Sequence, residues 1–241
     1  MLDKKEIGII SGISVFLGII ISINFHGTIL SFEYLDILKN ILVLAIIFFV
    51  FVFAEKIAAD LLECKIKIKL LQSQRLGFRP IEKLKKGNFP WWFILPVLTY
   101  LLALGLQTKF IWLSVLNFDT ESKPARIKKR FFEPTEWDMA RIALAGTFSM
   151  IILGAITNAL GYTNYSLLCN LLALSSVIPI GQGLKVFFSS KWLWIFSIAL
   201  TITIFLLSFI LNPITTIIIS IIFAILAVFL LYGKQAEWGN R

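Results

Sequence analysis

Several apolar runs, each about as long as a bilayer is thick, constrain this chain more than any other feature. A helix needs about 20 consecutive apolar residues to cross the hydrocarbon core of a membrane. The chain has 241 residues, of which 58% are hydrophobic, and its mean hydropathy is +0.87. Soluble domains carry fewer apolar residues, so the sequence predicts an all-α polytopic membrane protein. The candidate crossings are 7–25, 40–62, 140–160, 165–187, 191–211 and 214–232.

A seventh apolar stretch, 91–107, is short for a crossing and contains Pro96 and Gly105. Basic residues concentrate on both sides of it, within 56–86 and 109–141. Basic loops favour the cytoplasmic side of a membrane. If 91–107 is re-entrant, every basic residue except Lys39 faces the cytoplasm. We therefore expect about six transmembrane helices plus a re-entrant or short seventh segment, in the cell membrane, with both termini cytoplasmic. A true seventh crossing is the alternative.

Residues 64–70 alternate between polar and apolar side chains, with Lys65, Lys67 and Lys69 at every second position. This period of two is typical of a half-buried strand. It predicts a small β element at the cytoplasmic membrane surface. The chain shows neither an internal repeat nor a low-complexity linker, so we expect one membrane domain over 1–241.

The net charge of +9 raises the question of a nucleic-acid partner. Proteins that bind single strands interleave stacking aromatic residues with basic ones, and the basic runs here lack that pattern. We therefore expect no nucleic acid. The basic segment 123–130 has two interpretations: it binds anionic lipid headgroups at the cytoplasmic face, or it only orients the chain in the membrane.

Residues 54–58 read Ala-Glu-Lys-Ile-Ala at the end of a long apolar run. In His-Glu-x-x-His, two histidines one helical turn apart bind one zinc ion, and the Glu between them is the general base. Glu55 occupies the position of that base, whereas Ala54 and Ala58 have no metal-binding atom. Alternatively, Glu55 is a structural carboxylate at a helix end that reaches water.

Two further segments follow in order. Residues 141–150 begin a helix with a small-residue face that includes Gly146. Residues 170–186 form an apolar helix interrupted by Pro179, Gly181 and Gly183. The interruption is either a tolerated kink or a polar notch that lines a cavity, where non-helical backbone is permitted inside a membrane.

The order and spacing of these three segments over residues 40–190 resemble the site-2 protease family of intramembrane zinc metalloproteases, especially its short archaeal-type members. The resemblance implies that the first segment corresponds to His-Glu-x-x-His, the second to Ala-Gly-Pro-x-x-Asn and the third to Asn-Leu-x-Pro-x-x-x-x-Asp-Gly. The same correspondence implies that Ala54 and Ala58 fall on the two His ligands, Glu55 on the base, Gln182 on the ligand Asp, Thr147 on the Pro, and Met150 on the substrate-holding Asn.

The resemblance implies a metalloprotease fold in which all three zinc-ligand residues have been replaced. We therefore expect a pseudoprotease without zinc that binds transmembrane segments or a membrane partner. Thr147, Met150, Gly181 and Gly183 are the expected client-binding positions, and Glu55 and Gln182 are expected to approach each other. An active protease with ligands we do not recognise is one alternative. A transporter or a structural subunit of a membrane complex is another.

Overall fold

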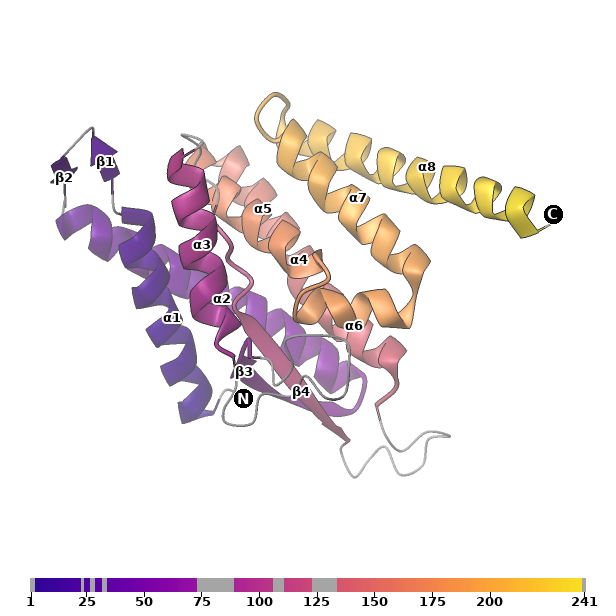
Figure 1. Ribbon diagram of the computed structural model, residues 1–241, viewed down its shortest axis with the longest axis horizontal. Coiled ribbons are helices and arrows are strands. Elements are labelled where there is room, and N and C mark those ends of the chain that lie inside the picture. Colours follow the sequence, from indigo (N-terminus) through magenta and orange to yellow (C-terminus); the bar gives the residue numbers. More distant parts are fainter. Residues whose placement is uncertain are drawn as a thin grey trace. The chain divides into compact units, whose positions relative to one another are not determined.

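The structure is a computed structural model that describes residues 3–22, 24–26, 29–31, 34–72, 89–105, 111–122 and 134–239 (Figure 1). The basic segment 123–130, which we expected to contact lipid, lies outside the described residues, as does 73–88. The helices are α1 (Lys4–Ser22), α2 (Tyr34–Leu61), α3 (Trp91–Gly105), α4 (Glu136–Ala159), α5 (Thr163–Val177), α6 (Gln182–Ser189), α7 (Lys191–Leu207) and α8 (Pro213–Gly239). The strands are β1 (Asn24–His26), β2 (Ile29–Ser31), β3 (Cys64–Leu70) and β4 (Leu116–Ser122).

The chain divides into two compact units. Unit 1 comprises Met1–Phe49 and Ile66–Asp119, and unit 2 comprises Val50–Lys65 and Thr120–Arg241. The boundaries fall inside α2, β3 and β4, so each of these three elements contributes to both units. One membrane domain over the whole chain therefore stays a prediction.

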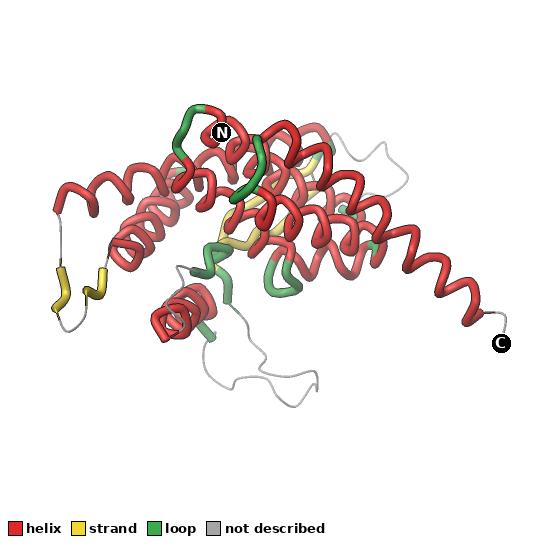
Figure 2. The backbone as a smooth tube through the Cα atoms, turned by 90° about the horizontal axis from the view of Figure 1, so that it is seen from above, coloured by secondary structure: helices red, strands yellow, loops and turns green. Residues whose placement is uncertain are grey.

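Three helices are long and apolar enough to cross a membrane: Lys4–Ser22, Leu35–Leu61 and Glu136–Ala159. The helices α5 and α6 together satisfy the same test but are bent by 52° at the break between them. The apolar segments of α3, α7 and α8 are shorter. The structure thus confirms a mostly helical chain with membrane-length apolar helices (Figure 2), whereas the number of crossings stays a prediction.

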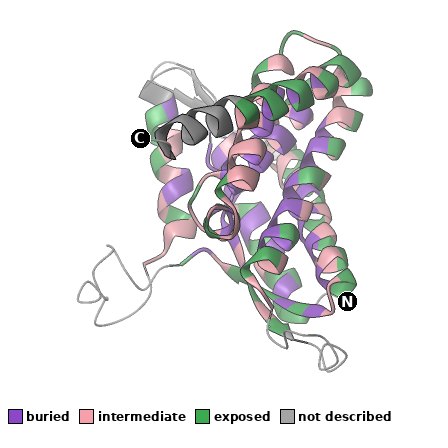
Figure 3. Cartoon of the chain, turned by 90° about the vertical axis from the view of Figure 1, so that its right-hand side faces the viewer, coloured by how far each residue is buried: buried purple, intermediate pink, exposed green. Residues whose placement is uncertain are grey.

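Between Ile41 and Ala54, the helix α2 is apolar around its whole circumference. Leu44, Phe48 and Phe51 are buried, while Ile46 and Phe53, on other sides of the helix, are exposed. Figure 3 shows exposed and buried residues alternating along the helices in this way. A helix that is apolar on every side is typical of a membrane span, because lipid covers the side chains that the protein leaves exposed.

Unit 1 contains the strand that the sequence predicted. Cys64, Ile66 and Ile68 are buried and the lysines between them are exposed, which confirms the alternation over 64–70. The strand β3 pairs with β4 in a two-stranded sheet, and Lys69 forms an ion pair with Asp119. The strands β1 and β2 form a separate antiparallel pair.

Within unit 1, α1 and α2 approach closely at Gly18. A methyl group there would lie 2.5 Å from Cγ1 of Ile41, so only glycine permits this approach. The Asn40 amide also donates a hydrogen bond of 2.9 Å to the Ser22 hydroxyl.

Unit 2 is built around α4. Its first turn is held by a capping box, in which Thr135 and Asp138 each accept a hydrogen bond from the other's backbone N–H. The helix α4 packs against α5 and α6. The helices α7 and α8 follow one another in the chain and pack side by side as a helical hairpin (Figure 1). The Trp194 indole N–H of α7 donates to the Val177 carbonyl at the end of α5, at 3.0 Å.

Candidate functional site

The most unusual residue of unit 2 is Glu55, an acidic side chain in the middle of apolar packing. It is 0% exposed, and neither of its oxygens has a hydrogen-bond partner among the described residues. It belongs to the buried stripe of α2 because it follows Phe51 by one helical turn. Burying a carboxylate away from water is costly unless it is paired. A helix-end carboxylate that reaches water, our alternative for Glu55, does not describe this environment.

Gln182 approaches Glu55 from α6, as the sequence predicted. The Gln182 side chain lies next to the Glu55 carboxyl, and the charge of Lys185, one turn further along α6, acts on the same carboxyl. Gln182 is itself 0% exposed, and neither of its polar side-chain atoms has a hydrogen-bond partner within the described residues. The two side chains therefore lie close together without a hydrogen bond between them.

The helix α4 contributes Gly146, which lets its backbone lie directly against the Glu55 side chain. A methyl group on Gly146 would be 3.0 Å from Cγ of Glu55 and 2.8 Å from Cε2 of Phe51. The small-residue face that the sequence placed on this helix therefore faces α2. We call Glu55, Gly146, Gln182 and Lys185 the polar cluster.

The break between α5 and α6 puts Gln182 into this cluster. The sequence predicted it from Pro179, Gly181 and Gly183, and α5 ends at Val177 just before them. Gly181 has φ 70° and ψ −114°, a conformation that side chains disfavour. The backbone packs so tightly around Gly183 that a methyl group added there would lie 2.0 Å from the Ile178 carbonyl oxygen. The two glycines are thus required by the backbone of the turn.

Of the four positions expected to hold a client, Thr147, Met150 and Gly183 are buried in the same unit, and Gly181 is half-buried. Thr147 is 2% exposed, and its hydroxyl is 2.8 Å from the Ser176 hydroxyl of α5. Met150, one turn further along α4, is 0% exposed. Thr147 and Ser176 therefore join α4 to α5, and a role of Thr147, Met150, Gly181 or Gly183 in client binding stays a prediction.

Ala54 and Ala58 are half-buried at the edge of the buried stripe of α2. Their methyl groups offer no donor for a metal. In the described part of the chain, no group of three or more His, Cys, Asp or Glu side chains comes together in a way that holds a metal ion. The polar cluster offers one carboxyl, one amide and the amine of Lys185, a set suited to hydrogen bonding with a polar group.

Replacing Glu55 with Gln should stabilise the protein. The substitution keeps the side-chain carbons that pack on Gly146 and removes a carboxyl whose ionised form burial penalises. We expect a gain on the order of 1 kcal/mol, seen as a higher Tm in detergent. The matched control is Glu136→Gln, at an exposed position in the first turn of α4. A lower Tm for Glu55→Gln alone would show that the carboxylate is well paired.

Sequence reasoning missed two contributors. The partner of Thr147 is Ser176, and the signal was a pair of serines, Ser175 and Ser176, inside an apolar helix. The second contributor is Trp194, whose indole N–H donates to the Val177 carbonyl at the end of α5. Both contacts join two different helices, and spacing within one helix does not reveal which faces of two helices meet.

Comparison of the chain with protein-family models, with curated proteins and with solved structures finds no match.

Proposed function

We propose that this chain is a membrane protein of site-2-protease-like architecture that binds transmembrane segments, or a membrane partner, without cutting them. Hydrolysis by such a fold needs a zinc ion, which activates the attacking water. Ala54 and Ala58 supply no ligand, and Gln182 supplies an amide in place of a carboxylate. Zinc is therefore expected to be absent, and Glu55 is the one remnant of the catalytic set.

One observation carries this proposal. Glu55 and Gln182 are 127 positions apart in the sequence, on different helices, and they approach each other in one buried cluster. That is the convergence expected if the general-base and third-ligand positions of a zinc protease were retained while the ligands were lost. Two side chains with unpaired polar atoms also offer hydrogen bonds to a polar group of a client, at a cost to stability that suits a binding site.

The proposed topology has about six crossings, with α3 re-entrant or a short seventh span and both termini cytoplasmic. The exposed lysines of β3 then face the cytoplasmic side, where anionic lipid headgroups attract them. Labelling with a membrane-impermeant thiol reagent tests the arrangement, because Cys64 and Cys169 are both buried and contribute little background. A cysteine introduced at Ser122 should react only from the cytoplasmic side. Reaction from outside would make α3 a true crossing.

Client binding requires α4 to separate from α5 and α6, since Thr147, Met150 and Gly183 are buried between helices. The test uses purified protein in lipid vesicles with a panel of synthetic single-span peptides, each labelled with a fluorophore at both ends. The protein should retain a subset of the peptides intact, as judged by co-purification and mass spectrometry.

Two variants of α2 sharpen this test. Glu55→Leu removes the carboxyl of the polar cluster and should weaken retention of the peptides. Phe53→Leu changes an exposed position two residues away and should leave retention unchanged. Cut peptides would favour an active protease with other ligands. No retention of any peptide, with a stoichiometric co-purifying protein, would favour a structural subunit instead.

A further inference from the structure

Backbone contacts within unit 1 indicate how the apolar segment around α3 enters and leaves the membrane. Two hydrogen bonds meet at Leu71, the residue after β3. Its carbonyl accepts from the Trp92 N–H in the first turn of α3 at 2.9 Å, and its N–H donates to the Val115 carbonyl at 2.8 Å. The start of α3 and residue 115, which follows α3 in the chain, therefore lie at the same level, beside the sheet of β3 and β4.

A third contact joins α3 to the chain that follows it, at a distance from the sheet. The Trp112 N–H donates to the Thr99 hydroxyl at 2.9 Å. Trp92 and Thr99 are seven residues apart on a helix, which gives a rise of about 10 Å. Trp112 and Val115 are three residues apart outside any helix, and three residues cover at most about 10 Å. The helix and residues 111–116, which we call the return segment, thus run side by side over a similar height (Figure 1).

Non-helical backbone inside a membrane must be covered by protein, because lipid offers it no hydrogen bonds. The return segment meets this condition, since its residues from Ile111 to Leu116 are each exposed by 7% or less. Its polar groups also bond within the protein. The indole N–H of Trp112 donates to the Ser114 carbonyl at 3.0 Å. The return segment is therefore suited to lie at membrane depth without being a helix.

The first turn of α1 reaches the same sheet. The Glu6 carboxylate is 6% exposed, and it accepts hydrogen bonds from the Ile68 N–H of β3 at 3.2 Å and from the Asp3 N–H at 2.8 Å. The helix α1 thus begins at the level of β3, where α3 begins and the return segment ends. The start of α1 carries exposed lysines, as β3 does, and basic residues favour the cytoplasmic side of a membrane.

We propose that α3 and the return segment form a re-entrant hairpin, joined across its two arms by Thr99, which enters and leaves the membrane on the side where α1 begins. A seventh crossing by α3 would instead place β4 on the opposite side of the membrane from β3, although the two strands pair in one sheet. The hairpin is independent of the function proposed above, because it rests on contacts of unit 1 and holds for a binding protein, an enzyme or a transporter alike.

Labelling with a membrane-impermeant thiol reagent, in sealed vesicles of both orientations, tests where the hairpin begins and ends. The introduced cysteines are Lys4→Cys, Gln72→Cys and Glu121→Cys, all at exposed positions. The native Cys64 and Cys169 are buried and contribute little background. All three introduced cysteines should react from one and the same side. Reaction of Glu121→Cys from the side opposite to Gln72→Cys would overturn the hairpin, and reaction of Lys4→Cys from the side opposite to Gln72→Cys would overturn the placement of α1.

Substitutions of Thr99 test the contact between the two arms. Valine removes the oxygen that accepts the Trp112 N–H and leaves this buried donor unpaired, whereas serine keeps the oxygen. We expect Thr99→Val to lower Tm in detergent by about 2–8 °C and Thr99→Ser to change Tm little. Thr203→Val in α7 is the matched control, since the Thr203 hydroxyl, like that of Thr99, donates to carbonyls of its own helix but accepts no bond from another described segment. A fall in Tm for Thr203→Val as large as that for Thr99→Val would overturn the role of Thr99.

Discussion

Gly183→Ala should unfold or severely destabilise unit 2. The added methyl group would meet the Ile178 carbonyl oxygen at 2.0 Å and the Val177 carbonyl oxygen at 2.5 Å. Both are backbone atoms, which do not move aside as a flexible side chain does. Overpacking of side chains alone typically costs about 1–3 kcal/mol, so we expect at least about 3 kcal/mol here. The measurement is Tm and the yield of folded protein in detergent.

Gly8→Ala is the matched control for this substitution. Gly8 lies in α1, and a methyl group there meets no atom within 4 Å. Alanine is the better helix former by about 1 kcal/mol, so this variant should be as stable as the wild type or more so. If Gly183→Ala behaves in the same way, the tight turn that brings Gln182 to Glu55 is not the native conformation.

Restoring the three ligand positions should create a zinc site. In Ala54→His/Ala58→His/Gln182→Asp, two imidazoles one helical turn apart on α2 meet a carboxylate from α6, with a position left open for water. We expect the triple variant to bind zinc with measurable affinity. Recovery of proteolysis should be poor, because partners that orient metal ligands typically contribute about 10–100-fold and Thr147 and Met150 replace the family's residues.

Two controls belong to the triple variant. Ala54→His/Ala58→His without the aspartate should bind zinc more weakly, since it lacks the third ligand. Ile57→His/Leu61→His places an equally spaced pair on an exposed face of α2 and should not gain affinity from Gln182→Asp. If Ala54→His/Ala58→His binds zinc with the same affinity as the triple variant, position 182 does not face the two alanines.

Local patterns in the sequence predicted local structure well. The alternation over 64–70 identified β3, and Pro179 with Gly181 and Gly183 located the break between α5 and α6. In both cases the determinant is confined to a few neighbouring residues: the two-residue period of a strand, or the backbone freedom of glycine. The approach of Glu55 and Gln182 was predicted from the resemblance, because local patterns carry no information on which helices meet.

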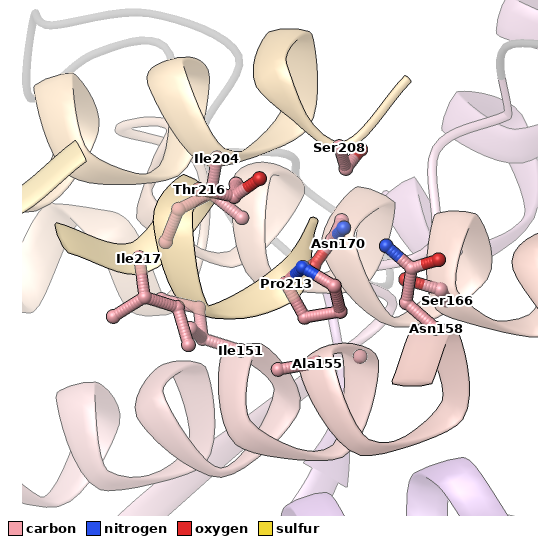
Figure 4. A pocket seen from close by; sticks show the side chains of 11 residues that line it. Ile151, Ala155, Asn158, Ser166, Asn170, Ile204, Ser208, Pro213, Thr216 and Ile217 are labelled. Carbon is pink, nitrogen blue, oxygen red and sulfur yellow. The ribbon is translucent and has the colours of Figure 1, made fainter. Parts of the chain in front are cut away.

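The packing between helices was much less predictable. The bond between Thr147 and Ser176 and the small pocket around Asn170, between α4, α5, α7 and α8 (Figure 4), depend on which faces of the helices meet, and an apolar helix offers no polar stripe to indicate its buried face. The bounds of α4 were predicted to within a few residues: the sequence placed a helix over 140–160, and the structure shows it over Glu136–Ala159. Its true start is set by the capping box at Thr135, outside the apolar run.

The zinc content of the wild-type protein tests the central claim most directly. The protein should be purified in mild detergent without chelators, dialysed against a zinc-buffered solution and measured by elemental analysis. Lacking ligand atoms at positions 54 and 58, it should contain no stoichiometric zinc, and its content should not change in Glu55→Gln. Stoichiometric zinc in the wild type that is lost on substitution of Glu55 or Gln182 would contradict the account and point to an active metal centre.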